Sequence, residues 1–294
     1  MIIGVSSYSF SQYLSNGTLT QLSAVAKASE LGFQAIEFTD LKPPAHLTQL
    51  DYAHQIKEEA AAHGIAISAY VVGANLAQTT PDAEIERLKG CVDVAAALGV
   101  TFFRHDAMSR YGDFRSFDQA LPTLTGAIRS VTEYAQARGI RTMVENHGLI
   151  CQDSDRIERL VNAVNHPNFG TLVDIGNFLC ADEEPAKAVS RVANLAFLVH
   201  AKDFEKINFG DFKNEDGYFK TRGGNHLKGV TLGSGCVPVA QCLAILKQAG
   251  FNGYVDLEFE GKEDCLKALA EGLAFIQSFS LIKNGADNIA RAVF

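Results

Sequence analysis

Acidic and histidine side chains stand at the ends of several short apolar runs in this sequence. Four of them end the last four runs: Glu145, Asp174, His200 and Glu258. A carboxylate that points into an apolar interior is costly unless an opposite charge compensates it. Three carboxylates and one imidazole suit a single hard to borderline divalent cation. We therefore expect one ion, with Mn²⁺ favoured over Mg²⁺, Co²⁺ or Zn²⁺, and not a thiolate-rich structural zinc site.

The apolar runs have the length of β-strands, and each is followed by a segment long enough for a helix. Glycine residues stand just beyond several of these predicted helices, where a left-handed residue ends a helix. They are Gly32, Gly64, Gly99, Gly139 and Gly250. Eight strands are predicted, at 2–5, 35–38, 65–71, 101–104, 140–145, 170–174, 196–200 and 254–258.

Strands that alternate with helices predict βαβ units and a parallel sheet. Eight such units in 294 residues predict one (β/α)₈ barrel that occupies residues 1–294 as a single domain. The interval between the last two strands is unusually long and rich in glycine and charge. We interpret 203–236 as a long loop after the seventh strand, and 281–294 as an apolar C-terminal extension.

The composition narrows the class of partner and the compartment. The net charge is −8, and no Lys/Arg run is present, which argues against a nucleic-acid partner. No stretch has the apolar length of a membrane span, and the N-terminus does not resemble a signal peptide. The six cysteines are scattered without paired spacing and are expected to be reduced. These features predict a cytoplasmic protein.

Other polar residues at the strand ends can each be interpreted in two ways. His147 shares a strand face with Glu145 and could be a catalytic base, or could orient a ligand. Arg104 and His105 end the fourth strand, and one of them should face the pocket. Glu37 is either a substrate contact or an ion pair in the barrel.

The order of these motifs resembles the xylose-isomerase-like barrel superfamily, in particular its sugar phosphate isomerase/epimerase group with ketose 3-epimerases and inosose-processing enzymes. The resemblance covers essentially the whole chain and is most specific in its last third. It rests on Glu145-Asn-His147, Asp174-x-Gly-Asn177, His200-x-Lys202-Asp203, Gly233-Ser-Gly235-Cys-Val237 and the closing segment 250–260. It implies that Glu145, Asp174, His200 and Glu258 bind the metal, and that Glu145 and Glu258 are the acid–base pair. Because Glu260 shares a strand face with Glu258, the ligand could be shifted to it.

The resemblance implies a metal-dependent sugar isomerase or epimerase that acts through an enediolate next to a carbonyl. The substrate contacts we expect are Asn177, Lys202, His105 and Glu260. The epimerases commonly carry histidine where this chain has Asn177, which puts a ketose substrate in doubt. The alternative is a lyase or dehydratase that eliminates a β-leaving group from an oxidised (3-oxo) sugar, glycoside or cyclitol, since the segment 221–229 resembles a loop of such relatives.

Two further classes fit less well. A DNA-repair endonuclease on the same barrel needs several more histidine ligands and a basic face, and the sequence has neither. A metal-free binding subunit is the fourth reading, and no residue favours it directly. The extension 281–294 would pack on a neighbouring subunit of a homo- or hetero-oligomer, or would cover the barrel.

Overall fold

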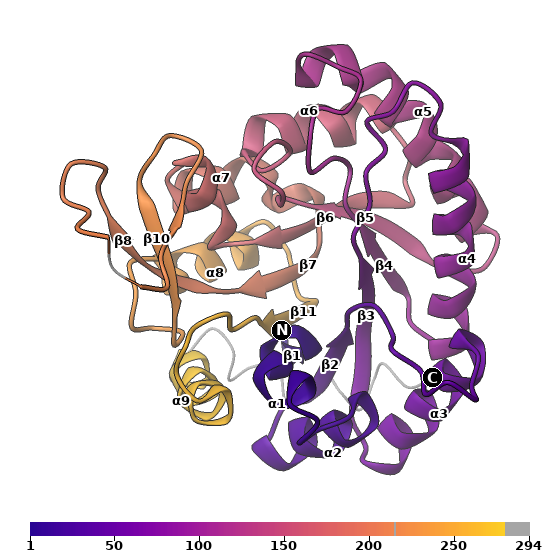
Figure 1. Ribbon diagram of the computed structural model, residues 1–294, viewed down its shortest axis with the longest axis vertical. Coiled ribbons are helices and arrows are strands. Elements are labelled where there is room, and N and C mark those ends of the chain that lie inside the picture. Colours follow the sequence, from indigo (N-terminus) through magenta and orange to yellow (C-terminus); the bar gives the residue numbers. More distant parts are fainter. Residues whose placement is uncertain (215, 280–294) are drawn as a thin grey trace.

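The computed structural model describes residues 1–214 and 216–279 (Figure 1). Eight parallel strands close into a barrel in the order β1-β11-β7-β6-β5-β4-β3-β2. The predicted (β/α)₈ architecture is confirmed, and every predicted strand is found to within one residue at each end. The strands are β1 Ile2–Ser6, β2 Ala35–Phe38, β3 Ala66–Val72, β4 Phe102–His105, β5 Arg141–Glu145, β6 Phe169–Asp174, β7 Ala196–Ala201 and β11 Tyr254–Leu257.

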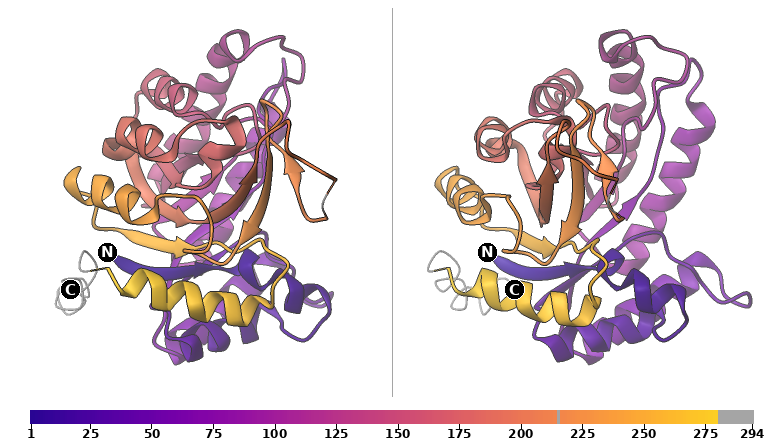
Figure 2. Two further views of the ribbon diagram at one scale, coloured as in Figure 1. Left: turned by 90° about the vertical axis from the view of Figure 1, so that its left-hand side faces the viewer. Right: turned by 60° about the vertical axis from the view of Figure 1, so that its left-hand side comes forward.

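Amphipathic helices surround the barrel. The predicted glycines close helices as expected, and Gly32 and Gly99 are the left-handed residues that end α2 and α4 (φ 95° and 76°). Figure 2 shows the last helix, α9, beside the N-terminal strand β1. The helices are α1 Ser11–Ser15, α2 Gln21–Leu31, α3 Gln49–Ala62, α4 Asp82–Leu98, α5 Phe117–Gln136, α6 Ser154–Val164, α7 Pro185–Val192, α8 Val239–Gln248 and α9 Cys265–Gln277, with short 3₁₀ turns η1 Ser7–Phe10, η2 Asn177–Ala181 and η3 Ala193–Leu195.

The interior of the barrel changes from apolar to polar along the strands. An apolar layer contains Met143, Leu172 and Leu198, which are buried against one another. Because side chains on a strand alternate between its two faces, the next inward positions are two residues further on. These positions are Glu145, Asp174 and His200. The same alternation that builds the core therefore presents the polar residues at the carboxyl ends of the strands.

The segment 203–236 is not the long loop that we predicted. It forms a three-stranded antiparallel sheet in the order β8-β10-β9, built from β8 Asp203–Ile207, β9 Phe219–Lys220 and β10 His226–Val230. We refer to residues 203–236 as the cap, and it lies to one side of the barrel in Figure 1. The sequence did not predict these strands because β9 and part of β8 are exposed. They have few apolar positions, so glycine and charged residues dominate the pattern.

The Asp203 carboxylate fixes the return of the cap to the barrel. Besides the N–H of Phe204, it accepts hydrogen bonds at 2.9–3.0 Å from three backbone N–H groups of the returning segment, those of Gly233, Gly235 and Val237. A Cβ atom at Gly235 would lie 2.2 Å from Asp203 Oδ1, so only glycine allows this approach. The Gly-x-Gly-x-Val element noted in the sequence is thus the partner of Asp203.

Three other expectations concern the chain as a whole. All six cysteines fall within the described residues and are unpaired. Among those residues, no helix is long and apolar enough to cross a membrane. The predicted extension 281–294 lies outside the described residues.

Candidate metal centre and active site

The four predicted ligands converge at the mouth of the barrel. Asp174 and His200 are register partners on β6 and β7, and one ligand atom from each of the four side chains lies within 4.8 Å of the others. In the described part of the chain, this group contains Glu258 and not Glu260. Glu260 lies outside this group, and its Oε2 is 3.5 Å from Lys202 Nζ. The geometry therefore favours Glu258 as the fourth ligand.

The cluster leaves buried polar atoms that a cation would satisfy. Asp174 Oδ2, His200 Nδ1 and Glu258 Oε2 have no partner in hydrogen-bond geometry among the described residues, although the Lys202 ammonium forms ion pairs with Glu258 Oε2 at 2.6 Å and with Asp174 Oδ2 at 3.2 Å. His200 Nδ1 lies 3.4 Å from Glu258 Oε2, 3.8 Å from Glu145 Oε1 and 4.0 Å from Asp174 Oδ2. The three carboxylates that face His200 Nδ1 outnumber the one ammonium that reaches Asp174 and Glu258, and ligand atoms this close together fit a divalent ion.

The charges within the cluster are strongly coupled. Burial raises the pKa of Asp174 to about 7, against the charge of Lys202 and with the help of the Glu258 carboxylate. Burial also raises the pKa of Glu258, but Lys202 and His200 outweigh it and hold that pKa well below its usual range. Asp174 is therefore the ligand whose proton a cation would have to displace near neutral pH.

Glu37 lies behind His200 and does not reach the pocket. Its Oε2 is 2.7 Å from His200 Nε2, and its Oε1 accepts a hydrogen bond from Ser6 Oγ at 2.8 Å. When Nε2 carries the hydrogen that Glu37 accepts, Nδ1 is free to offer its lone pair to a cation. Of our two interpretations of Glu37, the ion pair in the barrel is the one observed.

The fourth strand directs Arg104 toward the ligand cluster and turns His105 away from it. Arg104 Nη2 lies 2.6 Å from Asp106 Oδ1 and 2.6 Å from Glu145 Oε2. His105 is fully buried on the helix-facing side of β4, where its ring stacks on Phe169. Our prediction that His105 contacts substrate is wrong, because successive residues of a strand point to opposite faces.

Asp106 is a site residue that the sequence analysis did not single out. Its Oδ1 lies 2.9 Å from Nδ1 of His147, whose half-exposed ring borders the cavity. Asp106 thus fixes the orientation of the His147 ring through Nδ1, and this contact does not use the other ring nitrogen, Nε2. The only signal in the sequence was the polar run that continues after the fourth strand.

Asn177 and Lys202 connect the ligands to the cavity. The Asn177 amide donates to Glu145 Oε1 at 3.0 Å and accepts from Lys202 Nζ at 3.2 Å. Lys202 Nζ also lies 2.6 Å from Glu258 Oε2 and 3.2 Å from Asp174 Oδ2. Lys202 and Arg104 are therefore fixed cations on the Glu258 and Glu145 sides of the cluster.

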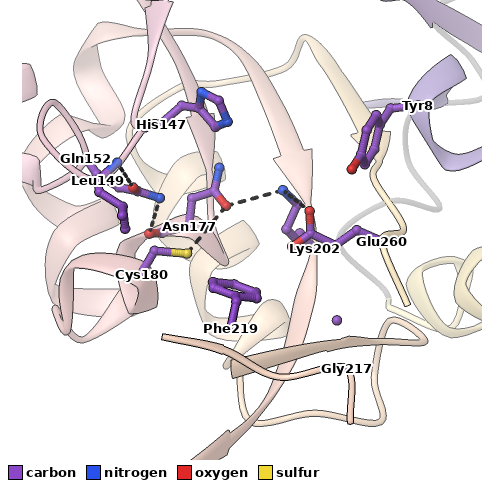
Figure 3. A pocket seen from close by; sticks show the side chains of 12 residues that line it. Tyr8, His147, Leu149, Gln152, Asn177, Cys180, Lys202, Gly217, Phe219 and Glu260 are labelled. Atoms are coloured by element: carbon purple, nitrogen blue, oxygen red, sulfur yellow. Dashed lines mark hydrogen bonds and ion pairs between the residues drawn. The ribbon is translucent and has the colours of Figure 1, made fainter. Parts of the chain in front are cut away.

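A cavity of about 400 Å³ lies between the barrel mouth and the cap (Figure 3). Its size falls within the range of small-molecule sites. The barrel supplies His147, Asn177, Lys202 and Glu260, and the cap supplies Gly217, Phe219 and Gly229. Three of our four predicted substrate contacts thus border this cavity, and His105 does not.

Comparison with known families agrees with this geometry. The family described as xylose isomerase-like TIM barrel matches residues 25–279. The chain belongs to this family. No curated protein matches the sequence significantly. Membership confirms the predicted superfamily. It does not specify the reaction, which must be argued from the residues of the site.

Several solved structures share the fold of this chain. The probable 3-DHS dehydratase AsbF from Bacillus anthracis is 16% identical, with a TM-score of 0.74 over 95% of this chain and 99% of the other. D-psicose 3-epimerase from Clostridium cellulolyticum H10 is 16% identical, with a TM-score of 0.72 over 94% and 98%. The IOLI protein with a bound zinc atom is 15% identical, with a TM-score of 0.73 over 98% and 99%.

Proposed function

We propose that this xylose isomerase-like barrel is a divalent-metal-dependent sugar isomerase or epimerase that moves a proton next to a carbonyl through an enediolate. The observation that carries the proposal is the convergence of three carboxylates and one imidazole, with one ligand atom of each within 4.8 Å of the others, beside a small-molecule cavity. An epimerase and a zinc-containing protein among the similar structures support the same class.

In this proposal Glu145, Asp174, His200 and Glu258 hold the ion, with Mn²⁺ as the favoured metal. When bound, the ion would supply positive charge beside a carbonyl oxygen and so favour loss of a proton from the adjacent carbon. Glu145 and Glu258 come from the two outer strands of the neighbouring set β5-β6-β7-β11, so they reach the substrate from different sides. One carboxylate removes the proton, and the other returns it at the opposite face or the neighbouring carbon.

The remaining polar residues orient the sugar. Lys202 donates from its ammonium group, Glu260 accepts from hydroxyls, and His147 does either through the ring nitrogen that Asp106 leaves available. Asn177 shapes the wall more than it binds, because Glu145 and Lys202 already engage both ends of its amide.

The test is a screen of sugars and oxidised glycosides in D₂O with the Mn²⁺-loaded protein. Solvent deuterium on a carbon next to the carbonyl of a rearranged sugar is the expected result. Glu258→Gln should lose both the ion and the exchange, whereas Glu260→Gln, the matched control on the same strand face, should keep the ion. Rearrangement without deuterium, or an active protein that binds no divalent ion, contradicts the proposal.

A second candidate is a lyase that expels a β-leaving group from the same intermediate. The observation that favours it is the Asp106–His147 pair, which gives the cavity a proton-transfer group in addition to the two glutamates. A dehydratase is also among the similar structures. Release of water or an aglycone with a new double bond, abolished by His147→Ala, would assign this reaction.

A further inference from the structure

One side of the cavity exposes apolar side chains that the protein leaves uncovered. Among the described residues, six large hydrophobic side chains are exposed, and three of them border this cavity: Tyr8, Leu149 and Phe219. Leu149 is 42% exposed and Phe219 is 38% exposed. Figure 3 shows Leu149, Cys180 and Phe219 along one side, with His147 and Tyr8 across from them. Exposed apolar groups gathered in a cavity are characteristic of a binding site.

Leu149 is held in an unfavourable backbone conformation that keeps its side chain at the cavity. Its φ of 66° lies in the left-handed region, which a branched residue seldom adopts. The Leu149 N–H donates to Gln152 Oε1 at 2.5 Å, and its carbonyl accepts from Arg222 of the cap at 3.2 Å. Strain of this kind persists where the surroundings enforce it, and it concentrates at ligand sites.

Phe219 is held at the cavity by a contact within the cap. Its ring meets the buried ring of Phe204 edge-on, with centroids 5.7 Å apart. Because Phe219 belongs to β9 and Phe204 to β8, the cap sheet itself presents this ring to the cavity. The apolar wall is therefore built from both the barrel loop and the cap.

The polar groups beside this wall are already engaged within the described structure. Gln152 accepts from Leu149 N–H and donates to the Asn177 carbonyl at 2.9 Å. The Asn177 amide bonds Glu145 and Lys202, and the Cys180 thiol is directed at the Asn177 side-chain oxygen. A hydroxyl group placed here would give up its hydrogen bonds to water and find few partners on the protein. An apolar group has no hydrogen bonds to give up.

We propose that the wall formed by Leu149 and Phe219 is a subsite for an apolar substituent, aryl or alkyl, carried by the sugar. The inference rests on the proposed function for the sugar and adds what the sugar bears. The reacting ring lies against the ligand cluster, Lys202 and Glu260, and its substituent lies between the loop after β5 and the cap. A phosphate or carboxylate substituent is disfavoured, because Lys202 and Arg104 are each paired with two or more carboxylates.

The test compares three probes on the Mn²⁺-loaded protein by calorimetric titration: phenyl β-D-glucopyranoside, methyl β-D-glucopyranoside and benzyl alcohol. The phenyl glycoside should bind about tenfold more tightly than the methyl glycoside. Leu149→Ala, which keeps the backbone strain, and Phe219→Ala should each remove most of that preference. Two exposed residues outside the cavity are matched controls, and Leu50→Ala and Phe209→Ala should leave it unchanged.

The outcomes separate this inference from the proposed function. Equal affinity for the two glycosides, or a preference that survives both variants, overturns the subsite and leaves the sugar reaction standing. Binding of benzyl alcohol that depends on Leu149 and Phe219, without binding of either glycoside, keeps the subsite and counts against a sugar. A protein that binds none of the three probes overturns the subsite.

Discussion

The contact between Glu37 and His200 predicts that a residue outside the cavity controls metal affinity. Glu37 is fully buried and lies 2.7 Å from His200 Nε2, the nitrogen opposite the one that faces the ligand cluster. Glu37→Gln keeps the shape and an oxygen acceptor but removes the negative charge that strengthens this hydrogen bond. Residues that orient a metal-binding histidine typically change affinity by about 10–100-fold. At about 1.4 kcal/mol per tenfold change, the loss is about 1.4–2.8 kcal/mol of binding free energy.

The assay is calorimetric titration of the metal-free protein with Mn²⁺. The chain offers a matched control in Glu59, which pairs with His63 at 3.1 Å on the exposed face of α3. Glu59→Gln makes the same chemical change away from the site and should leave the affinity unchanged. Thermal unfolding of both variants shows whether each is folded. A folded Glu37→Gln protein with the affinity of the parent would refute the role of Glu37 in setting the His200 nitrogen.

Three further predictions follow from the site and the cap. Because the pKa of Asp174 is raised to about 7 without metal, Mn²⁺ affinity should be level above that pH and fall about tenfold per unit below it, as titrations at stepped pH will show. Asp106→Asn should lower kcat by about tenfold or more while Mn²⁺ stays bound, because His147 loses its charged partner; unchanged kinetics would exclude that role. Gly235→Ala should cost about 1–3 kcal/mol of unfolding free energy, since its Cβ would overlap an oxygen of Asp203. Gly210→Ala, where the added Cβ meets open space, should cost less than about 1 kcal/mol, and denaturant unfolding of both variants measures the difference.

The sequence was sufficient to predict the barrel and the convergence of the four polar side chains because both depend on strand periodicity. A strand that ends in an inward-facing polar residue gives the same signal at Glu145, Asp174 and His200, and closure of the sheet then brings them together. The choice between Glu258 and Glu260 needed coordinates, since both share one face of the chain. The two glutamates differ in how far along the chain they lie beyond the strand, and periodicity gives only the face on which a side chain lies.

Other features could not be predicted because they depend on pairing across the fold. Arg104 and His105 are adjacent, so an uncertainty of one residue in the strand exchanges the inward and outward faces. Asp106 is recognised as a site residue only when Arg104 and His147, which follows the next strand, are seen to reach it. The cap strands are short and partly exposed, so their sequence pattern is weak. Asp203, which begins the first of them, lies about 30 residues before the glycines whose N–H groups it accepts.

The most direct test of the metal centre is an anomalous difference map measured at the manganese absorption edge from crystals of the Mn²⁺-loaded protein. The structure predicts one strong peak within about 2.0–2.6 Å of Asp174 Oδ2, His200 Nδ1 and Glu258 Oε2, with Glu145 as the fourth ligand. A map without a peak among these four side chains, or with its only peak elsewhere on the protein, would contradict the account.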